Sequence, residues 1–170
     1  MGQARTILLV DDSESDLLLL HAGFQMARCD ALLQEVHNGE EAIAYLAGID
    51  PYCDRAKFPL PMLMLLDLNM PKKNGFDVLA WVRSQRTLKR LTIVVLTASL
   101  RTQDLDRAFD LGASAFLVKP SEISELADML QTLWAWVQFC HFPRLTTPLS
   151  EPGNQWSPGP RAQGSGPLRN

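Results

Sequence analysis

Three carboxylates each follow directly on a short apolar run. Asp11 and Asp12 come after residues 7–10, and Asp67 comes after the five apolar residues 62–66. If the runs are parallel strands, their carboxyl ends meet at one edge of the sheet and the acids converge. Three carboxylates a few ångströms apart repel by roughly 4 kcal/mol per pair at an effective dielectric near 20, so a cation must offset them. Ligands of this kind suit Mg²⁺, which keeps waters and accepts phosphate oxygens.

A hydroxyl and an ammonium group are placed in the same way on two later runs. Thr97 follows the apolar run 91–96, and Lys119 follows the run 114–118. Lys119 supplies a positive charge and Thr97 a hydroxyl donor, and both suit an anion beside a metal ion. Each residue alone has a plain structural explanation, such as a helix cap or a solvated charge. Together they predict a phosphoryl-transfer site in which Asp67 is the nucleophile and forms an aspartyl-phosphate.

These residues need a parallel sheet to bring them together, and the hydrophobic pattern predicts one. Strand-like and helix-like segments alternate five times along the chain, which is typical of a doubly wound sheet with helices on both faces. We therefore expect an α/β fold with a five-stranded parallel sheet flanked by five helices. The predicted strands are 6–10, 31–36, 62–66, 91–96 and 114–118, and the predicted helices are 17–28, 38–46, 76–86, 102–111 and 121–140.

Composition limits the domain organisation and the classes of partner. A chain of 170 residues that is 46% hydrophobic can bury one full core. We expect this domain at 5–140, followed by a Pro/Gly/Ser-rich tail at 141–170 that is flexible or packs locally. A net charge of −3 gives no basic field for nucleic acid, and no apolar stretch reaches the roughly 20 residues of a membrane span. The three cysteines have no metal-like spacing, which favours reduced thiols in the cytoplasm.

Four segments carry a resemblance to a known family. They are Val-Asp-Asp-Ser at 10–13, Leu-Leu-Asp-Leu-Asn-Met-Pro-Lys-Lys-Asn-Gly at 65–75, Val-Leu-Thr-Ala at 95–98 and Ala-Ser-Ala-Phe-Leu-Val-Lys-Pro at 113–120. In this combination the chain resembles the response-regulator receiver domain of two-component signalling, from about residue 5 to residue 140. The resemblance implies a flavodoxin-like fold. The turn at 68–75 further resembles that of stand-alone regulators that partner phytochrome-type histidine kinases.

The resemblance implies a role for each acid and for one neighbouring residue. Asp67 would be the phosphoacceptor, taking phosphate from a histidine kinase or from a phosphotransfer protein. Asp12 and Asp67 would bind Mg²⁺ directly, Asp11 largely through water, and Asn69 through its backbone carbonyl. Such a domain is not an enzyme in the usual sense, beyond Mg²⁺-dependent autophosphorylation and slow autodephosphorylation.

The resemblance also implies how the domain signals. Thr97 and Lys119 would contact the phosphoryl oxygens, and the peptide bond between Lys119 and Pro120 would be cis. Phe116 stands at the aromatic switch position, which turns inward when Thr97 is drawn to the phosphate. The surface affected would be formed by the helix from residue 102, the strand at 114–118 and the final helix.

Two other functions are compatible with part of this pattern. A phosphohydrolase of the haloacid-dehalogenase type also uses an aspartate nucleophile, Mg²⁺, a hydroxyl residue and a lysine. Its acidic pair comes last along the chain and its nucleophile belongs to an Asp-x-Asp pattern, whereas here the acidic pair comes first and Asn69 holds the second position after Asp67. The second alternative is a receiver-like scaffold that is not phosphorylated, although all five polar site residues are present.

The final predicted helix is apolar on two sides, which points to a second packing partner. Its core face is formed by Ile123, Leu126, Ala127, Leu130, Trp134 and Val137, and a second stripe by Met129, Leu133, Trp136 and Cys140. We expect a homodimer through Met129, Leu133 and Trp136. The kinase, or the chain's own tail with Phe142 and Trp156, is the alternative occupant of this stripe.

Overall fold

The elements alternate strictly between strand and helix. The computed structural model describes residues 5–148, so Trp156 of the tail lies outside the described part. The strands are β1 (Thr6–Val10), β2 (Leu32–Val36), β3 (Leu63–Leu66), β4 (Thr92–Thr97) and β5 (Ala115–Val118). The helices are α1 (Glu14–Met26), α2 (Gly39–Ala47), α3 (Gly75–Ser84), α4 (Thr102–Asp110) and α5 (Ile123–Phe139). The predicted boundaries are therefore correct to within three residues for all ten elements.

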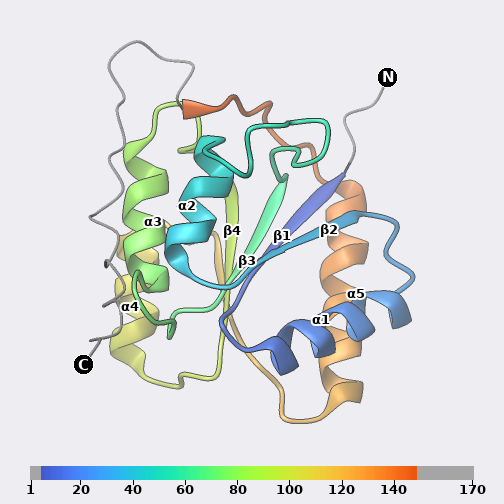
Figure 1. Cartoon of the computed structure of the whole chain (residues 1–170). Helices are drawn as coiled ribbons and strands as arrows, with labels where there is room; N and C mark the ends of the chain where they lie inside the picture. Colours follow the sequence, from blue (N-terminus) through green and yellow to red (C-terminus); the bar gives the residue numbers. More distant parts are fainter. Residues whose placement is uncertain (1–4, 149–170) are drawn as a thin grey trace, which may run out of the picture.

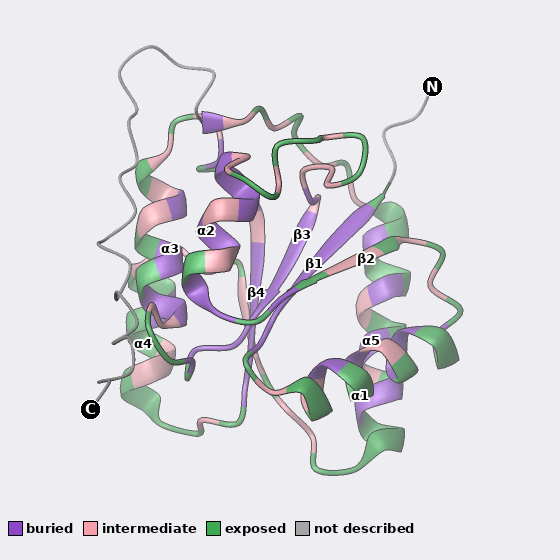
Figure 2. Ribbon diagram, in the orientation of Figure 1, coloured by how far each residue is buried: buried purple, intermediate pink, exposed green. Residues whose placement is uncertain are grey.

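All strand pairs are parallel, in the order β2-β1-β3-β4-β5. Helices α1 and α5 cover one face of the sheet, and α2, α3 and α4 cover the other (Figure 1). The middle strands β1, β3 and β4 are buried nearly throughout, while β2 and β5 at the edges are partly exposed (Figure 2). This arrangement confirms the predicted doubly wound sheet with five strands and five helices.

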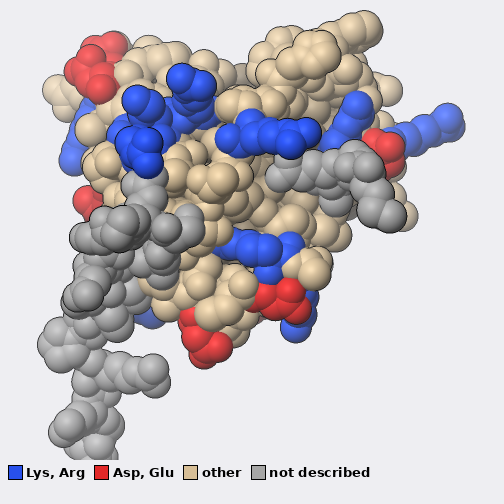
Figure 3. Space-filling view, turned by 90° about the horizontal axis from the view of Figure 1, so that it is seen from above, with Lys and Arg blue, Asp and Glu red and all other residues tan. Residues whose placement is uncertain are grey.

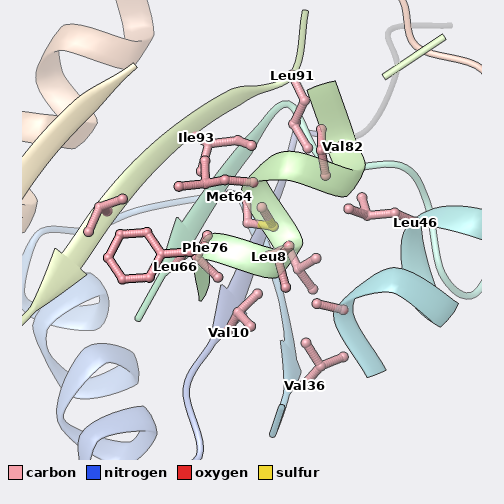
Figure 4. Packing of buried hydrophobic residues seen from close by; sticks show 14 of the residues in the cluster. Leu8, Val10, Val36, Leu46, Met64, Leu66, Phe76, Val82, Leu91 and Ile93 are labelled. Carbon is pink, nitrogen blue, oxygen red and sulfur yellow. The ribbon is translucent and has the colours of Figure 1, made fainter. Parts of the chain in front are cut away.

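Two apolar clusters hold the layers together, one on each face of the sheet. On the α2–α4 face, side chains from β1, β3 and β4 pack against α2 and α3, as the labelled residues of Figure 4 illustrate. On the other face, Leu17, Leu20 and Phe24 of α1 pack with Leu130 and Trp134 of α5. A strand that is buried on both faces must be apolar at consecutive positions, which explains the uninterrupted apolar runs of the sequence.

Short polar side chains begin the helices that lead away from the strand ends. The Ser13 side chain accepts a hydrogen bond from the Asp16 backbone N–H at the start of α1. At α3, Asn74 and Asp77 form a reciprocal capping box. Such caps satisfy backbone donors that a helix leaves open in its first turn. They fix where α1 and α3 leave the edge of the sheet at which the strands end.

The second apolar stripe of α5 divides between the interior and the surface. Met129 and Leu133 are half-buried and pack against the α1–α5 cluster, whereas the Trp136 side chain is 50% exposed. Ile123, expected on the core face, is instead 40% exposed and is the first residue of α5. Phe142 of the segment after α5 packs against the same cluster.

The segment after α5 crosses the edge of the sheet at which the strands begin (Figure 1). Leu145 packs against the α2–α4 cluster, so the segment joins the two faces. Arg55, from the loop between α2 and β3, donates hydrogen bonds to the Tyr45 and Phe58 carbonyls and to Thr147 Oγ1. Local packing of the tail is therefore present as far as residue 148.

Charges are unevenly distributed between the two edges of the sheet. On the face where the strands begin, Lys and Arg side chains gather (Figure 3), and a groove of about 350 Å³ there is lined by Arg86, Lys89, Arg90 and Arg144. Asp11, Asp12 and Asp67 lie at the opposite edge, where β1 and β3 end, and form a local concentration of acidic groups. None of the helices between residues 5 and 148 combines the length and apolar composition that a bilayer crossing requires.

Candidate phosphoacceptor site

The three predicted carboxylates meet where β1 and β3 end. Val10 and Leu66 are register partners, so Asp11 and Asp67 leave adjacent strands side by side. The Asp67 backbone N–H donates to the Val10 carbonyl at 2.9 Å. One carboxylate oxygen from each of Asp11, Asp12 and Asp67 lies within 4.8 Å of the others. The side chains of Asp11 and Asp67 are buried, and Asp12 is exposed.

The donor set of this cluster fits a hard divalent cation. All three groups offer oxygen ligands, and two of them, Asp11 and Asp67, are buried, where a carboxylate needs a cation as partner. The exposed carboxylate of Asp12 leaves the cluster open on one side, which suits an ion that keeps part of its water shell. Asn69 is exposed two residues after Asp67, and its Nδ2 lies 3.5 Å from Thr97 Oγ1.

Lys119 supplies positive charge inside the same cluster. Its Nζ donates to Asp11 Oδ2 at 2.5 Å and to Asp16 Oδ2 at 2.6 Å, and it lies 3.9 Å from Asp67 Oδ1. Burial alone would lower the pKa of Lys119, but the hydrogen bonds to Asp11 and Asp16, together with the negative charges of Asp67 and Asp11, outweigh burial and raise the pKa. Lys119 is therefore charged, and it offsets part of the repulsion between the acids.

The sequence pattern predicts Asp16 only as a residue at the start of a helix and not as a partner of Lys119. It lies in the first turn of α1, three residues after the N-cap Ser13. No sequence spacing marks its contact with Lys119, because that contact depends on the direction in which α1 leaves the end of β1. The structure thus adds a fourth carboxylate to the surroundings of Lys119.

The Asp67 carboxyl has a raised pKa. Burial is the main cause and the neighbouring Asp11 charge adds to it, while Lys119, the Thr97 hydroxyl and the Leu68 backbone act in the opposite direction. A carboxylate that is poorly solvated and close to like charge is a stronger nucleophile than one in bulk water, provided that a cation holds it ionised. The position of Asp67 between Asp11 and Lys119 meets both conditions.

Thr97 and Phe116 lie on the neighbouring strands β4 and β5. Thr97 is fully buried at the end of β4, and its carbonyl accepts the Lys119 backbone N–H at 2.9 Å. Phe116 is half-buried on β5 opposite Val95 and packs against the α2–α4 cluster. The sheet therefore brings Thr97 to the site edge, whereas Phe116 lies within β5, three residues before Lys119.

The peptide bond before Pro120 corrects one prediction. The expected cis bond between Lys119 and Pro120 is trans in the structure, and the cis bond among the described residues joins Asp50 and Pro51. Trans is the intrinsically preferred isomer of a bond before proline by about 0.5–1 kcal/mol. With Lys119 Nζ already held by two carboxylates, the strand end reaches the site without the rarer isomer.

A family model and a curated relative both match this chain to response regulators. The model of the response regulator receiver domain matches residues 7–131. Response regulator Rcp1 of Synechocystis is 34% identical over 140 residues, a stretch that covers 82% of this chain and 93% of the relative.

Solved structures agree with the sequence comparison. The phosphorylated cyanobacterial phytochrome response regulator RcpA is 33% identical and superposes with a TM-score of 0.75, covering 82% of this chain and 99% of that one. Response regulator RPA3017, described in red light signalling of R. palustris, is 32% identical with a TM-score of 0.78 and the same coverage. The Mn²⁺-bound form of Rcp1 is 33% identical with a TM-score of 0.74, covering 82% and 99% of the two chains.

Proposed function

This chain belongs to the response-regulator receiver family of two-component signalling, and on that premise we propose that Asp67 is its phosphoacceptor. The observation that carries the proposal is the meeting of Asp11, Asp12 and Asp67 within 4.8 Å, with Lys119 Nζ 3.9 Å from Asp67. Asp67 combines burial, a raised pKa and an adjacent cation, which is the environment of a carboxylate nucleophile.

The transfer is a displacement at phosphorus. An Asp67 oxygen attacks the phosphorus of a phosphohistidine, the P–O bond forms, the P–N bond breaks, and its electron pair returns to the imidazole. In this proposal Lys119 and the Thr97 hydroxyl contact the transferred oxygens. Mg²⁺ held by Asp11, Asp12, Asp67 and the Asn69 carbonyl would neutralise charge on those oxygens.

The donor in this proposal is a histidine kinase of the phytochrome type or a phosphotransfer protein. Support comes from the similarity to RcpA, a phytochrome response regulator, over nearly the full length of that chain.

The proposed location of the chain is the cytoplasm. The three cysteines are free thiols in the structure, which fits a reducing compartment. Apart from Mg²⁺-dependent autophosphorylation and slow autodephosphorylation, the chain has no enzymatic activity in this proposal.

The signalling surface in this proposal is formed by α4, β5 and α5. Phe116 lies on β5 within the α2–α4 cluster, and Val118 on the same strand is exposed. Movement of Thr97 toward a phosphoryl group would free space for the Phe116 ring and change this surface. Couplings of this kind are typically about 1–3 kcal/mol, enough to shift an existing equilibrium.

A homodimer through α5 is the proposed assembly. Trp136 and Phe139 are exposed on this helix, at 50% and 87%. Met129 and Leu133 lie on the same side, half-buried against the chain's own core. Exposed aromatic residues of this size are typical of the centre of a protein interface.

Intact-mass analysis tests the phosphoacceptor. Incubation with acetyl phosphate and Mg²⁺ is expected to add one phosphate to the wild-type chain and none to Asp67→Asn. Asp106→Asn makes the same chemical change at an exposed position of α4 and should still be phosphorylated.

The other two functions give different results in the same experiment. A wild-type chain that gains no phosphate under these conditions would support the scaffold. Steady release of phosphate from a simple phosphomonoester, lost in Asp67→Asn, would instead support a hydrolase.

A further inference from the structure

Lys119 is held by two carboxylates other than that of the proposed phosphoacceptor. Its Nζ is 2.5 Å from Asp11 and 2.6 Å from Asp16, but 3.9 Å from the nearest Asp67 oxygen. The last distance is too long for a hydrogen bond. In this state the charge of the ammonium group is therefore shared mainly between Asp11 and Asp16.

Asp16 differs from Asp11 in burial and in what its side chain does. Asp11 is almost completely buried beside Asp67, and its Oδ1 also accepts the Ser13 backbone N–H. The Asp16 side chain is 35% exposed, and the start of α1 uses the Asp16 backbone N–H, which donates to Ser13 Oγ. The Asp16 carboxylate is thus not required for the helix cap, and its close contact is with Lys119.

We propose that Asp16 is a positioning residue that competes with the phosphoryl group for Lys119. The inference rests on the proposed function of Asp67. A phosphoryl group brings a charge of about −1.5 to −2 to the site. An ammonium group that is already shared between two carboxylates attracts this anion less than one that is held by Asp11 alone. Asp16 therefore lowers the affinity of the site for a phosphoryl group.

The surroundings of Asp16 allow the contact to open. Asp16 and Lys119 line a cavity of about 300 Å³, together with Leu19, Ala98 and Pro120. A partly exposed carboxylate beside such a space can turn into water once Lys119 moves toward the phosphoryl oxygens. Release of Asp16 then accompanies phosphorylation, and the free energy of the Asp16 contact opposes it.

Beryllofluoride, which mimics a phosphoryl group on aspartate, provides the test. Binding to the full chain in saturating Mg²⁺ is followed by ¹⁹F NMR. Asp16→Asn is expected to bind on the order of fivefold more tightly, the scale of a partly exposed ion pair. Glu14→Gln removes the same charge from the same first turn of α1 at an exposed position, and is expected to stay within about twofold of wild type because of screening.

A second measurement does not depend on phosphoryl chemistry. Hydrogen exchange of the Lys119 ammonium group with water, followed by ¹⁵N NMR without beryllofluoride, is expected to be several times faster in Asp16→Asn and unchanged in Glu14→Gln. The proposal is overturned if the two variants gain affinity equally, if Asp16→Asn binds no more tightly than wild type, or if its ammonium exchange is unchanged. Failure of the wild-type chain to bind beryllofluoride would count against the role of Asp67, while the exchange measurement would still decide the role of Asp16.

Discussion

At the scale of single residues, the site works by opposing effects on one carboxyl group. Burial and Asp11 raise the pKa of Asp67, and Lys119 with Thr97 limit the rise. The Asp67 pKa is thus higher in the folded chain than in the unfolded one. Between the unfolded-state and the folded-state pKa, the folded chain binds more protons at Asp67 than the unfolded chain does. The protonated Asp67 therefore favours the folded state at low pH, and this contribution to the free energy of unfolding is lost as the pH rises through the folded-state pKa.

Removing the Asp67 charge should therefore stabilise the metal-free chain. In EDTA at pH 7, Asp67→Asn is expected to raise the free energy of unfolding by about 1–2 kcal/mol, because relief of the repulsion from Asp11 is partly cancelled by loss of the attraction to Lys119. The gain should shrink as the pH is lowered toward the ordinary carboxyl pKa, where the wild-type group takes up a proton in both states. Urea unfolding across this pH range measures it, and Asp106→Asn, which is exposed, should show no comparable gain. A gain that is equal at acid and neutral pH would contradict the proposed cause.

At the scale of elements, the turn after β3 must pass very close to α3. A Cβ atom added at Gly75 would lie 2.4 Å from the Asp67 carbonyl oxygen and 2.8 Å from Leu68 Cα. Both are backbone atoms of the segment after β3 that carries Asp67, the proposed phosphoacceptor. The Gly75 N–H also donates to the Leu68 carbonyl at 3.0 Å. The first residue of α3 thus fixes the position of Asp67.

Substitution of this glycine should disturb the site as well as the fold. Gly75→Ala is expected to lower the free energy of unfolding by about 1–3 kcal/mol, as for other overpacked positions, and to weaken Mg²⁺ binding because Asp67 must shift. Thermal unfolding and calorimetric Mg²⁺ titration measure the two effects.

Gly23 offers a matched control within α1. A Cβ there would approach the end of the Leu130 side chain at 2.6 Å, and a flexible side chain can yield. Gly23→Ala should therefore leave Mg²⁺ affinity unchanged. Equal loss of affinity in both variants would show that the Gly75 contact has no special bearing on Asp67.

The elements were largely predictable from sequence because strands buried on both faces leave uninterrupted apolar runs. The carboxyl ends of those runs then placed Asp11, Asp67 and Lys119 at one edge. The contact of Asp16 with Lys119 was not predictable in this way, since it depends on the direction in which α1 leaves β1. The prediction of a cis bond before Pro120 was wrong. It came from the family resemblance, and in this chain the bond is trans.

At the scale of the whole molecule, the proposed homodimer depends on the exposed side of α5. We expect the wild-type chain to be a dimer by light scattering and Trp136→Glu to be a monomer, because a buried charge at the centre of an apolar interface has no partner. Leu18→Glu places the same charge on α1, at a leucine that is also exposed, and should remain a dimer. An unchanged mass for Trp136→Glu rules out this use of α5, and dissociation by Leu18→Glu would place the interface on α1.

The strand order also determines which part of the site is lost first when the chain opens locally. Asp11 and Asp67 leave β1 and β3 in the interior of the sheet, whereas Lys119 leaves β5 at its edge. Edge elements with partly exposed residues separate at a lower free energy than the centre. A transient opening of that edge would remove the lysine and leave the acids in place, so the site would lose its own cation before it lost its nucleophile.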